Sequence, residues 1–149
     1  MKNLFDEQVN HEIISRIEKI SSGINAIWGK MNAGQMLAHC SVGLETALGD
    51  KTQKRSFIGL LFGNMAKKQV FSEKPFKKGL PTDKLFIIND DRNIEEEKKK
   101  IKSLLERFAK AGTAGISKHP HVFFGMLTPY EWGILQYKHL DHHFKQFGV

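Results

Sequence analysis

The sequence predicts an all-α protein, a four-helix bundle with a long central crossover and a possible extra short helix. Apolar residues recur at helical spacing in four segments, residues 6–20, 32–48, 93–111 and 128–147. Residues 73–92, between the second and third of these, lack the pattern and contain Pro75, Gly79 and Pro81. Four helices with a long crossover in the middle are the elements of a four-helix bundle.

Apolar stripes indicate which side of each helix faces a shared core. Side chains three or four residues apart lie on one side of a helix. In the first three segments the stripes are Val9, Ile13, Ile17 and Ile20; Ala33, Leu37, Cys40, Leu44 and Leu48; and Ile94, Ile101, Leu104, Leu105 and Phe108.

Capping and stop residues delimit the helices. Asn32 is a good N-cap for the second helix, and Gly49 ends it. The fourth begins with Thr128-Pro129-Tyr130-Glu131, an N-cap threonine with proline at N1 and glutamate at N3, which predicts a capping box. Gly148 is a good stop at its other end.

The middle of the chain is harder to assign. Residues 56–71 predict either one helix or two short ones, because Gly59 and Gly63 interrupt them. Residues 73–92 predict a long connection with one short extended piece at 85–88, and residues 112–127 predict a loop.

Length and composition narrow the class of protein. A chain of 149 residues predicts one domain, residues 1–149. No stretch approaches the roughly 18 consecutive apolar residues of a membrane-spanning helix, so no membrane partner is predicted. The start of the chain lacks a secretory signal, and the single cysteine excludes an internal disulfide. Both features favour a cytoplasmic protein.

The net charge of +7 comes from the middle of the chain. Residues 51–110 hold 16 Lys/Arg and 8 Asp/Glu, a balance of +8. A solvated lysine surface is the simpler interpretation. The alternative function is a basic, non-catalytic module that binds nucleic acid or an anionic partner, although no nucleic-acid motif supports it. The residues involved would be Lys67, Lys68, Lys77, Lys78 and Lys98–Lys100.

Three histidines form the candidate metal site. His139 and His143 are four residues apart, so on a helix they lie about 40° apart, one turn above the other. His39 flanks the apolar stripe of the second helix, and Gly43 removes side-chain bulk beside it. Packed helices come within roughly 8–10 Å, close enough for His39 to complete the set. Three imidazoles with an open position suit catalytic Zn²⁺, and imidazole also suits Ni²⁺, Cu²⁺ or Fe²⁺.

Simpler roles remain open for these residues. His142 and His143 would favour the negative end of a helix dipole without any metal, and His142 could also pair with His139. His39 alone would more often be a hydrogen-bonded core histidine.

Other polar residues are candidates for supporting roles. Cys40 on an apolar stripe is a poor nucleophile. His119 and His121 are loop histidines that could be mobile ligands or proton-transfer groups. Glu45, Asp141 and Gln146 could hydrogen-bond near the site, the two acids by orienting a ligand imidazole. Trp28 and Trp132 are expected to be core or interface anchors.

Two motifs resemble the DinB/YfiT-like metalloenzyme superfamily. Residues 32–39, Asn-Ala-Gly-Gln-Met-Leu-Ala-His, are similar to the second-helix segment of that family, which ends in a ligand histidine. Residues 139–146, His-Leu-Asp-His-His-Phe-Lys-Gln, are similar to the ending of its last helix. Residues 119–133 look like a branch of unassigned function.

The resemblance implies a four-helix bundle, often dimeric, that holds a divalent metal through His39, His139 and His143. It further implies a thiol-dependent S-transferase or a related enzyme whose co-substrate is a low-molecular-weight thiol. The expected function is therefore a divalent-metal-dependent transferase or hydrolase, with zinc or nickel, acting on a small molecule. The basic middle and the elongated 73–92 connection depart from the family pattern and leave the substrate open.

Overall fold

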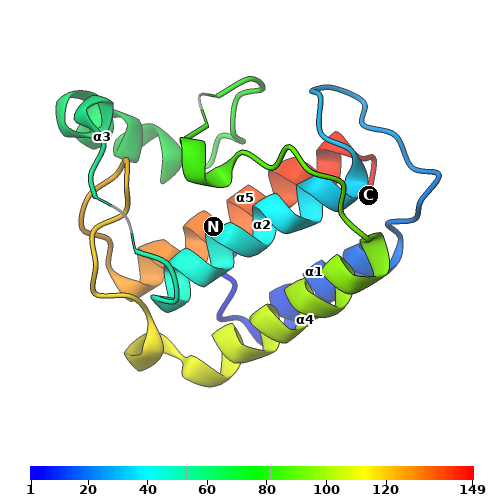
Figure 1. Cartoon of the computed structure of the whole chain (residues 1–149). Helices are drawn as coiled ribbons and strands as arrows, with labels where there is room; N and C mark the ends of the chain where they lie inside the picture. Colours follow the sequence, from blue (N-terminus) through cyan, green and yellow to red (C-terminus); the bar gives the residue numbers. More distant parts are fainter. Residues whose placement is uncertain (53, 81) are drawn as a thin grey trace.

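The computed structural model describes residues 1–52, 54–80 and 82–149, and within these ranges the chain is all-helical, with no β-strand. The predicted all-α class is therefore confirmed for the described residues. The elements, shown in Figure 1, are α1 (Glu7–Glu18), α2 (Ala33–Leu48), α3 (Phe57–Val70), the 3-10 helix η1 (Lys84–Phe86), α4 (Ile94–Ala111), the 3-10 helix η2 (Thr113–Gly115) and α5 (Pro129–Gln146).

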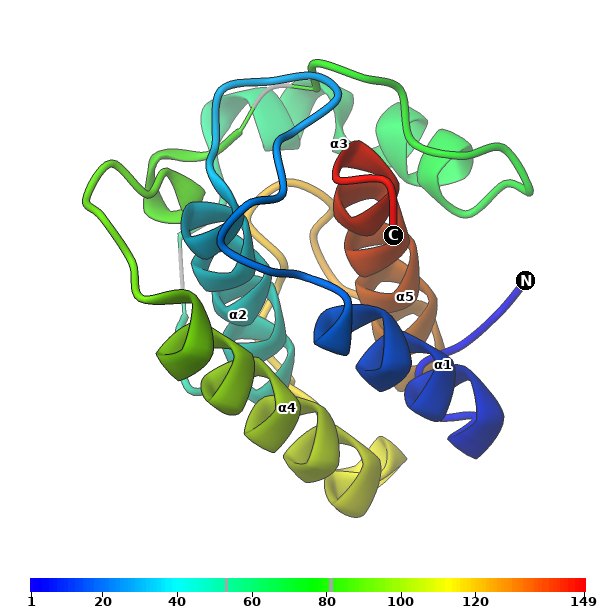
Figure 2. The same cartoon turned by 90° about the vertical axis from the view of Figure 1, so that its right-hand side faces the viewer.

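The helices α1, α2, α4 and α5 lie side by side around one core (Figures 1 and 2). α2 contacts α4 and α5, and α1 contacts the same two helices from the other side. Each helix contributes fully buried apolar side chains, among them Ile13, Leu37, Leu105 and Leu140. The apolar stripes predicted from the sequence are thus the surfaces that meet.

Local capping fixes the ends of the two helices that carry the candidate site. The Asn32 side chain accepts a hydrogen bond from the Gln35 backbone, and Gln35 returns one to the backbone of Asn32. Thr128 and Glu131 form the same reciprocal pair at the start of α5. Gly49 ends α2 with a φ of 82°, which favours glycine. These three sequence predictions are confirmed.

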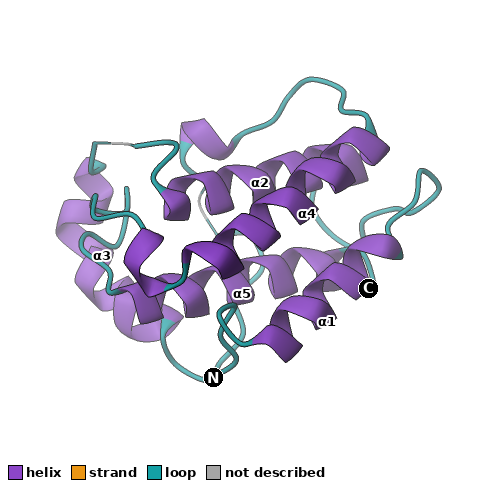
Figure 3. Ribbon diagram, turned by 90° about the horizontal axis from the view of Figure 1, so that it is seen from below, coloured by secondary structure: helices purple, strands orange, loops and turns teal. Residues whose placement is uncertain are grey.

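Residues 57–70 form one helix, α3, rather than two short ones, and it lies outside the group of four (Figures 1 and 3). Its glycines are contact points. A Cβ atom at Gly59 would lie 2.8 Å from the backbone of Phe123, and one at Gly63 would overlap the Phe123 carbonyl oxygen. The two glycines therefore allow α3 to approach the 122–124 backbone closely.

The connection between α3 and α4 contains a helical turn where an extended piece was predicted. Lys84–Phe86 form the 3-10 helix η1, because the Asp83 carboxylate accepts a hydrogen bond from the Leu85 backbone and caps the turn. Leu85 and Phe86 belong to this turn, so the predicted extended piece is wrong for these two residues, whereas Ile87, directly after the turn, is extended. η1 contacts α2.

No helix in the described part of the chain combines the length and the apolar composition needed to cross a membrane.

Candidate metal centre

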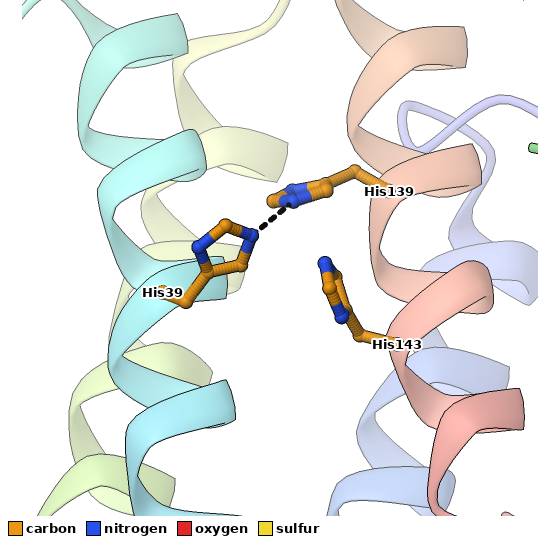
Figure 4. Close-up of side chains that lie close together, drawn as sticks. All are labelled: His39, His139 and His143. Atoms are coloured by element: carbon orange, nitrogen blue, oxygen red, sulfur yellow. Dashed lines mark hydrogen bonds between the residues drawn. The ribbon is translucent and has the colours of Figure 1, made fainter. Parts of the chain in front are cut away.

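His39 of α2 and His139 and His143 of α5 point toward one another (Figure 4). Their ring centroids lie 4.6–4.8 Å apart in all three pairs. One nitrogen atom from each ring can be chosen so that all three lie within 4.8 Å of one another. The three residues selected from the sequence are therefore brought together, and they could hold a metal ion.

Gly43 allows α5 to bring its histidine this close to α2. A Cβ atom at this position would lie 3.0 Å from His139 Nδ1 and 3.3 Å from His139 Cε1. Such contacts are tighter than side chains normally make, so a larger residue would require the ring to shift by a few tenths of an ångström. The sequence-based role of Gly43 is supported by this geometry.

The orientation of His39 is set by a backbone carbonyl. Its Nδ1 lies 2.8 Å from the Phe86 oxygen, which belongs to η1. A carbonyl oxygen only accepts, so His39 Nδ1 carries the proton and donates. His39 Nε2 consequently presents its lone pair toward the other two rings.

Gln146 sets the orientation of His143 in the same way. Its side-chain Nε2 donates to the Trp28 carbonyl oxygen at 2.6 Å, which turns the amide oxygen toward the imidazole. His143 Nδ1 donates to this Oε1 at 2.8 Å. His143 Nε2 is therefore the lone-pair nitrogen, and the prediction that Gln146 hydrogen-bonds near the site is confirmed.

The third ring, His139, faces His39 directly. The two Nε2 atoms are 2.8 Å apart, and since His39 Nε2 carries no proton, His139 Nε2 donates in this pair (Figure 4). A cation bound by all three Nε2 atoms requires that proton to leave Nε2 for Nδ1. The buried Gln136 Oε1 has no hydrogen-bond partner among the described residues. Gln136 Oε1 and His139 Nδ1 each lie 3.0 Å from the Cβ atom that a side chain at Gly43 would have, so Gln136 is the candidate acceptor for this proton.

Burial keeps all three imidazoles neutral. It lowers the pKa of His143 to about 3 and holds the pKa of His139 well below its ordinary value, where the neighbouring histidines add to the effect. Burial also lowers the pKa of His39, opposed by its bond to the Phe86 carbonyl. Metal ions bind the neutral form of imidazole, so the site is ready for a cation at neutral pH.

The donor set fits a divalent transition metal. Three imidazoles are a known catalytic zinc set, and zinc–nitrogen bonds of about 2.0–2.1 Å place tetrahedral ligands roughly 3.3 Å apart. The 2.8 Å between His39 Nε2 and His139 Nε2 would have to widen by about half an ångström. The most widely separated donor atoms, which lie within 4.8 Å of one another, would have to close toward the same spacing.

A cavity of about 380 Å³ adjoins the cluster, and His39 and His143 form part of its wall. This volume falls in the range of small-molecule pockets. The rest of the lining mixes apolar and polar side chains and comes from the segment before α2, from α2 and from the η1 region: Lys30, Met31, Gln35, Thr82, Phe86, Ile87, Ile88 and Asn89.

Two acidic residues do not support the ligand rings as the sequence suggested. Glu45 forms ion pairs with Lys51 and Lys100. Asp141 forms ion pairs with Arg16 and Lys145. The prediction that either carboxylate orients a ligand imidazole is wrong, because basic side chains from neighbouring turns and helices occupy both.

The remaining histidines lie outside the cluster. His119 is exposed in the loop before α5. His121 is half-buried, and its Nδ1 accepts hydrogen bonds from the backbone of Phe123 and Phe124, so its role is to hold the loop. His142 stacks edge-on with Trp28 and reaches the edge of His143.

Cys40 is fully buried, and its thiol contacts the sulfur of Met36. Burial raises the pKa of this thiol far above its ordinary value. The prediction that Cys40 is a poor nucleophile is confirmed. Trp132 is a core residue, also as predicted.

Sequence reasoning missed the Phe86 carbonyl, which binds His39, and the candidate acceptor Gln136, whose oxygen lies beside the Gly43 position. A backbone carbonyl leaves no signal in residue type. Gln136 did leave one, since it lies three residues before His139 and therefore on the same side of the helix.

The fold and this cluster define an all-helical protein with three histidines that could hold a metal ion. The chain belongs to a family described as a protein of unknown function (DUF1569), whose family model matches residues 5–148. No curated protein and no solved structure matches the chain.

Proposed function

We propose that this protein is a divalent-metal-dependent enzyme, a transferase or hydrolase acting on a small molecule, with His39, His139 and His143 as the metal ligands. The observation that carries the proposal is the convergence of three neutral imidazoles from two helices, with donor atoms within 4.8 Å of one another. Zinc and nickel are the metals we propose, since both favour imidazole nitrogen.

The supporting residues favour a metal role over a purely structural one. The Phe86 carbonyl and Gln146 each hold the Nδ1 proton of one ring and leave its Nε2 facing the centre. Such partners fix the tautomer and the direction of metal-binding histidines. When bound, a divalent ion supplies a Lewis acid that polarises an acceptor and lowers the pKa of a coordinated water or thiol.

The adjoining cavity supports a small-molecule substrate. His39 and His143 line it, so a molecule held there would lie against the proposed ligands. Its walls contribute apolar surface from Phe86 and Ile87 and polar groups from Gln35 and Asn89, a mixture typical of substrate pockets.

We further propose a DinB/YfiT-like four-helix bundle that forms one domain over residues 1–149. The packing of α1, α2, α4 and α5 around one core, with the longest connection between α2 and α4, supports this assignment. Because residues 32–39 and 139–146 resemble that superfamily, we propose a thiol-dependent S-transferase as the reaction class, with a low-molecular-weight thiol as co-substrate. A homodimer and a cytoplasmic location complete the proposal.

Metal analysis of protein purified without a histidine tag tests the function. We expect about one equivalent of zinc or nickel per chain, and loss of it in His139→Ala and His143→Ala. His119→Ala removes an exposed histidine outside the cluster and is the matched control. Less than about a tenth of an equivalent of any transition metal, with none gained on adding Zn²⁺ or Ni²⁺, would contradict the proposal.

A further inference from the structure

The outer surface of α3 is the most unusual surface of the described molecule. Its six large apolar side chains are between 50% and 74% exposed, and they fall within nine residues: Phe57, Ile58, Leu60, Leu61, Phe62 and Met65. Apolar patches of this density on a soluble protein mark interaction sites.

The inner surface of α3 explains why this apolar side faces outward. Gly59 and Gly63 are buried against the Phe123 backbone, with no room for a side chain at either position. Arg55 donates to the Gly59 carbonyl, and Lys67 donates to the Met126 carbonyl and pairs with Glu131. A helix normally packs its large apolar side inward, but here close approach requires the small residues inside. The large apolar residues therefore face the solvent.

The segment that contains α3 carries the whole net charge of the protein. Residues 51–78 hold eight Lys/Arg and one acid, Glu73, a balance of +7, which equals the +7 of the entire chain. Lys54 and Lys68 flank the exposed face and are themselves exposed. Exposed apolar side chains bordered by basic ones are the composition of helices that lie on anionic lipid surfaces.

We propose that the outward face of α3 binds the surface of a membrane that contains anionic lipids. The apolar side chains enter the boundary between headgroups and acyl chains, and the surrounding lysines meet the headgroup charge. A helix that lies on a bilayer needs no spanning length, so this proposal revises the sequence-based prediction of no membrane partner. It is independent of the metal site.

Charge is also the reason to favour a lipid surface over a second copy of the chain. In a two-fold symmetric dimer the same patch meets itself, which would bring together two segments of +7 each. Two positively charged segments in contact repel each other, whereas an anionic surface attracts each of them.

Figures 1 and 2 show α3 and the first part of the connection that follows it along the same side of the molecule, away from α1 and α4, before the connection turns to enter α4. That connection contains Lys74, Lys77 and Lys78 together with exposed Leu80 and Leu85. The proposed membrane-facing side therefore extends beyond α3 with the same composition.

Sedimentation with lipid vesicles tests the proposal. We expect the wild-type chain to bind vesicles that contain phosphatidylserine at about one lipid in three, and to stay unbound with phosphatidylcholine alone. Binding should weaken as salt is raised. The double variant Phe57→Glu/Leu61→Glu should bind at least about tenfold more weakly, because both side chains face outward and their loss removes apolar area and adds repulsion.

The matched control is His11→Glu/Ser15→Glu, which adds the same two acidic side chains at exposed positions of α1, on the opposite side of the molecule. We expect it to bind vesicles like the wild type. Circular dichroism confirms that the variants remain folded. The proposal is overturned if the wild type does not sediment with the anionic vesicles, or if the double variant sediments equally well. A dimer in solution that the double variant dissociates, without vesicle binding, would instead assign the face to a second copy.

Discussion

At the scale of single residues, the site depends on which ring nitrogen carries each proton. Two rings have their Nδ1 protons held, by the Phe86 carbonyl and by Gln146. The third, His139, has its proton on the inward nitrogen, and the unpaired Gln136 oxygen lies near the outward one. In the metal-free protein Gln146 therefore accepts a hydrogen bond from a ligand histidine, whereas Gln136 Oε1 accepts none among the described residues. Substitution of each glutamine should reveal this difference in stability and in metal affinity.

We expect Gln136→Leu to lower metal affinity by about 10- to 100-fold, because the Nδ1 proton of a metal-bound His139 would lose its acceptor. The metal-free protein should keep its stability, since Gln136 Oε1 makes no hydrogen bond to lose among the described residues. Isothermal titration with Zn²⁺ and urea unfolding without metal measure the two quantities. Unchanged affinity would remove Gln136 from the site.

Gln146→Leu is the contrasting case, since it leaves both His143 Nδ1 and the Trp28 carbonyl without a partner. We expect it to destabilise the metal-free protein by about 1–3 kcal/mol and to weaken metal binding as well. Equal stability of the two glutamine variants without metal would contradict this assignment of the hydrogen bonds.

The buried histidines predict a loss of stability in mild acid. In the folded chain burial lowers the pKa of His143 to about 3 and the pKa of His121 to about 4, against 6.5 when exposed. Between pH 6.5 and these values the unfolded chain binds more protons, so acid favours unfolding. The stabilisation is complete above pH 6.5 and falls as pH drops, by up to about 1.4 kcal/mol per pH unit for each histidine.

Urea unfolding of the metal-free protein at about pH 7.5, 6.0 and 5.0 measures how the free energy of unfolding falls with pH. His143→Gln should flatten the decline, whereas His119→Gln, an exposed histidine, should leave it unchanged. A free energy of unfolding that is constant across this range would show that these imidazoles are not buried in neutral form.

At the scale of elements, the sequence predicted well those helices whose start, end and buried side depend on residues within the helix itself. The helices observed at α1, α2, α4 and α5 match the predicted segments to within about two residues at each end, because apolar stripes and caps lie within the segments themselves. Contacts between elements were harder to predict from the sequence. Gly59 and Gly63 suggested a break because their partner, the Phe123 backbone, is about sixty residues away in the chain.

The same division holds within the site. The three histidines were predicted because helical spacing and the packing of two helices constrain where they lie. The acidic partners were predicted wrongly, since Asp141 is bound by Arg16 of a different helix, which no local pattern indicates. The carbonyl of Phe86 depends on η1, a turn set by Asp83 rather than by the apolar residues that suggested an extended piece.

The contact between α2 and α5 predicts a separation of stability from metal binding. We expect Gly43→Ala to lower metal affinity by about tenfold or more, because the new methyl group would press on His139 Nδ1 and move the ring. Helix propensity opposes any loss of stability, since alanine is favoured over glycine in a helix by about 1 kcal/mol. Zinc titration and thermal unfolding follow the two effects.

Gly23→Ala is the control for this substitution, because a Cβ atom there would contact nothing within 4 Å. It should bind zinc like the wild type. A Gly43→Ala variant that also binds zinc normally would show that the approach of the two helices does not position His139.

At the scale of the whole molecule, the site joins helices that contact each other but belong to different ends of the chain. His39 lies on α2 and the other two rings on α5, so a cation bound by all three ties residues 39 and 143 together in the folded state. The unfolded chain does not hold this arrangement. Metal binding must therefore add to folding stability by linkage.

The expected gain follows from mass action. Free Zn²⁺ at about 100 times its dissociation constant stabilises the folded chain by about 2.7 kcal/mol, which for a chain of this size raises the Tm by roughly 5–10 °C. Differential scanning fluorimetry with and without Zn²⁺ measures the shift. His139→Ala should show no shift, and His142→Ala, which changes the neighbouring ring outside the cluster, should shift like the wild type. A shift of full size in His139→Ala would mean that zinc binds elsewhere, because the loss of one of three ligands must weaken a cation held by all three.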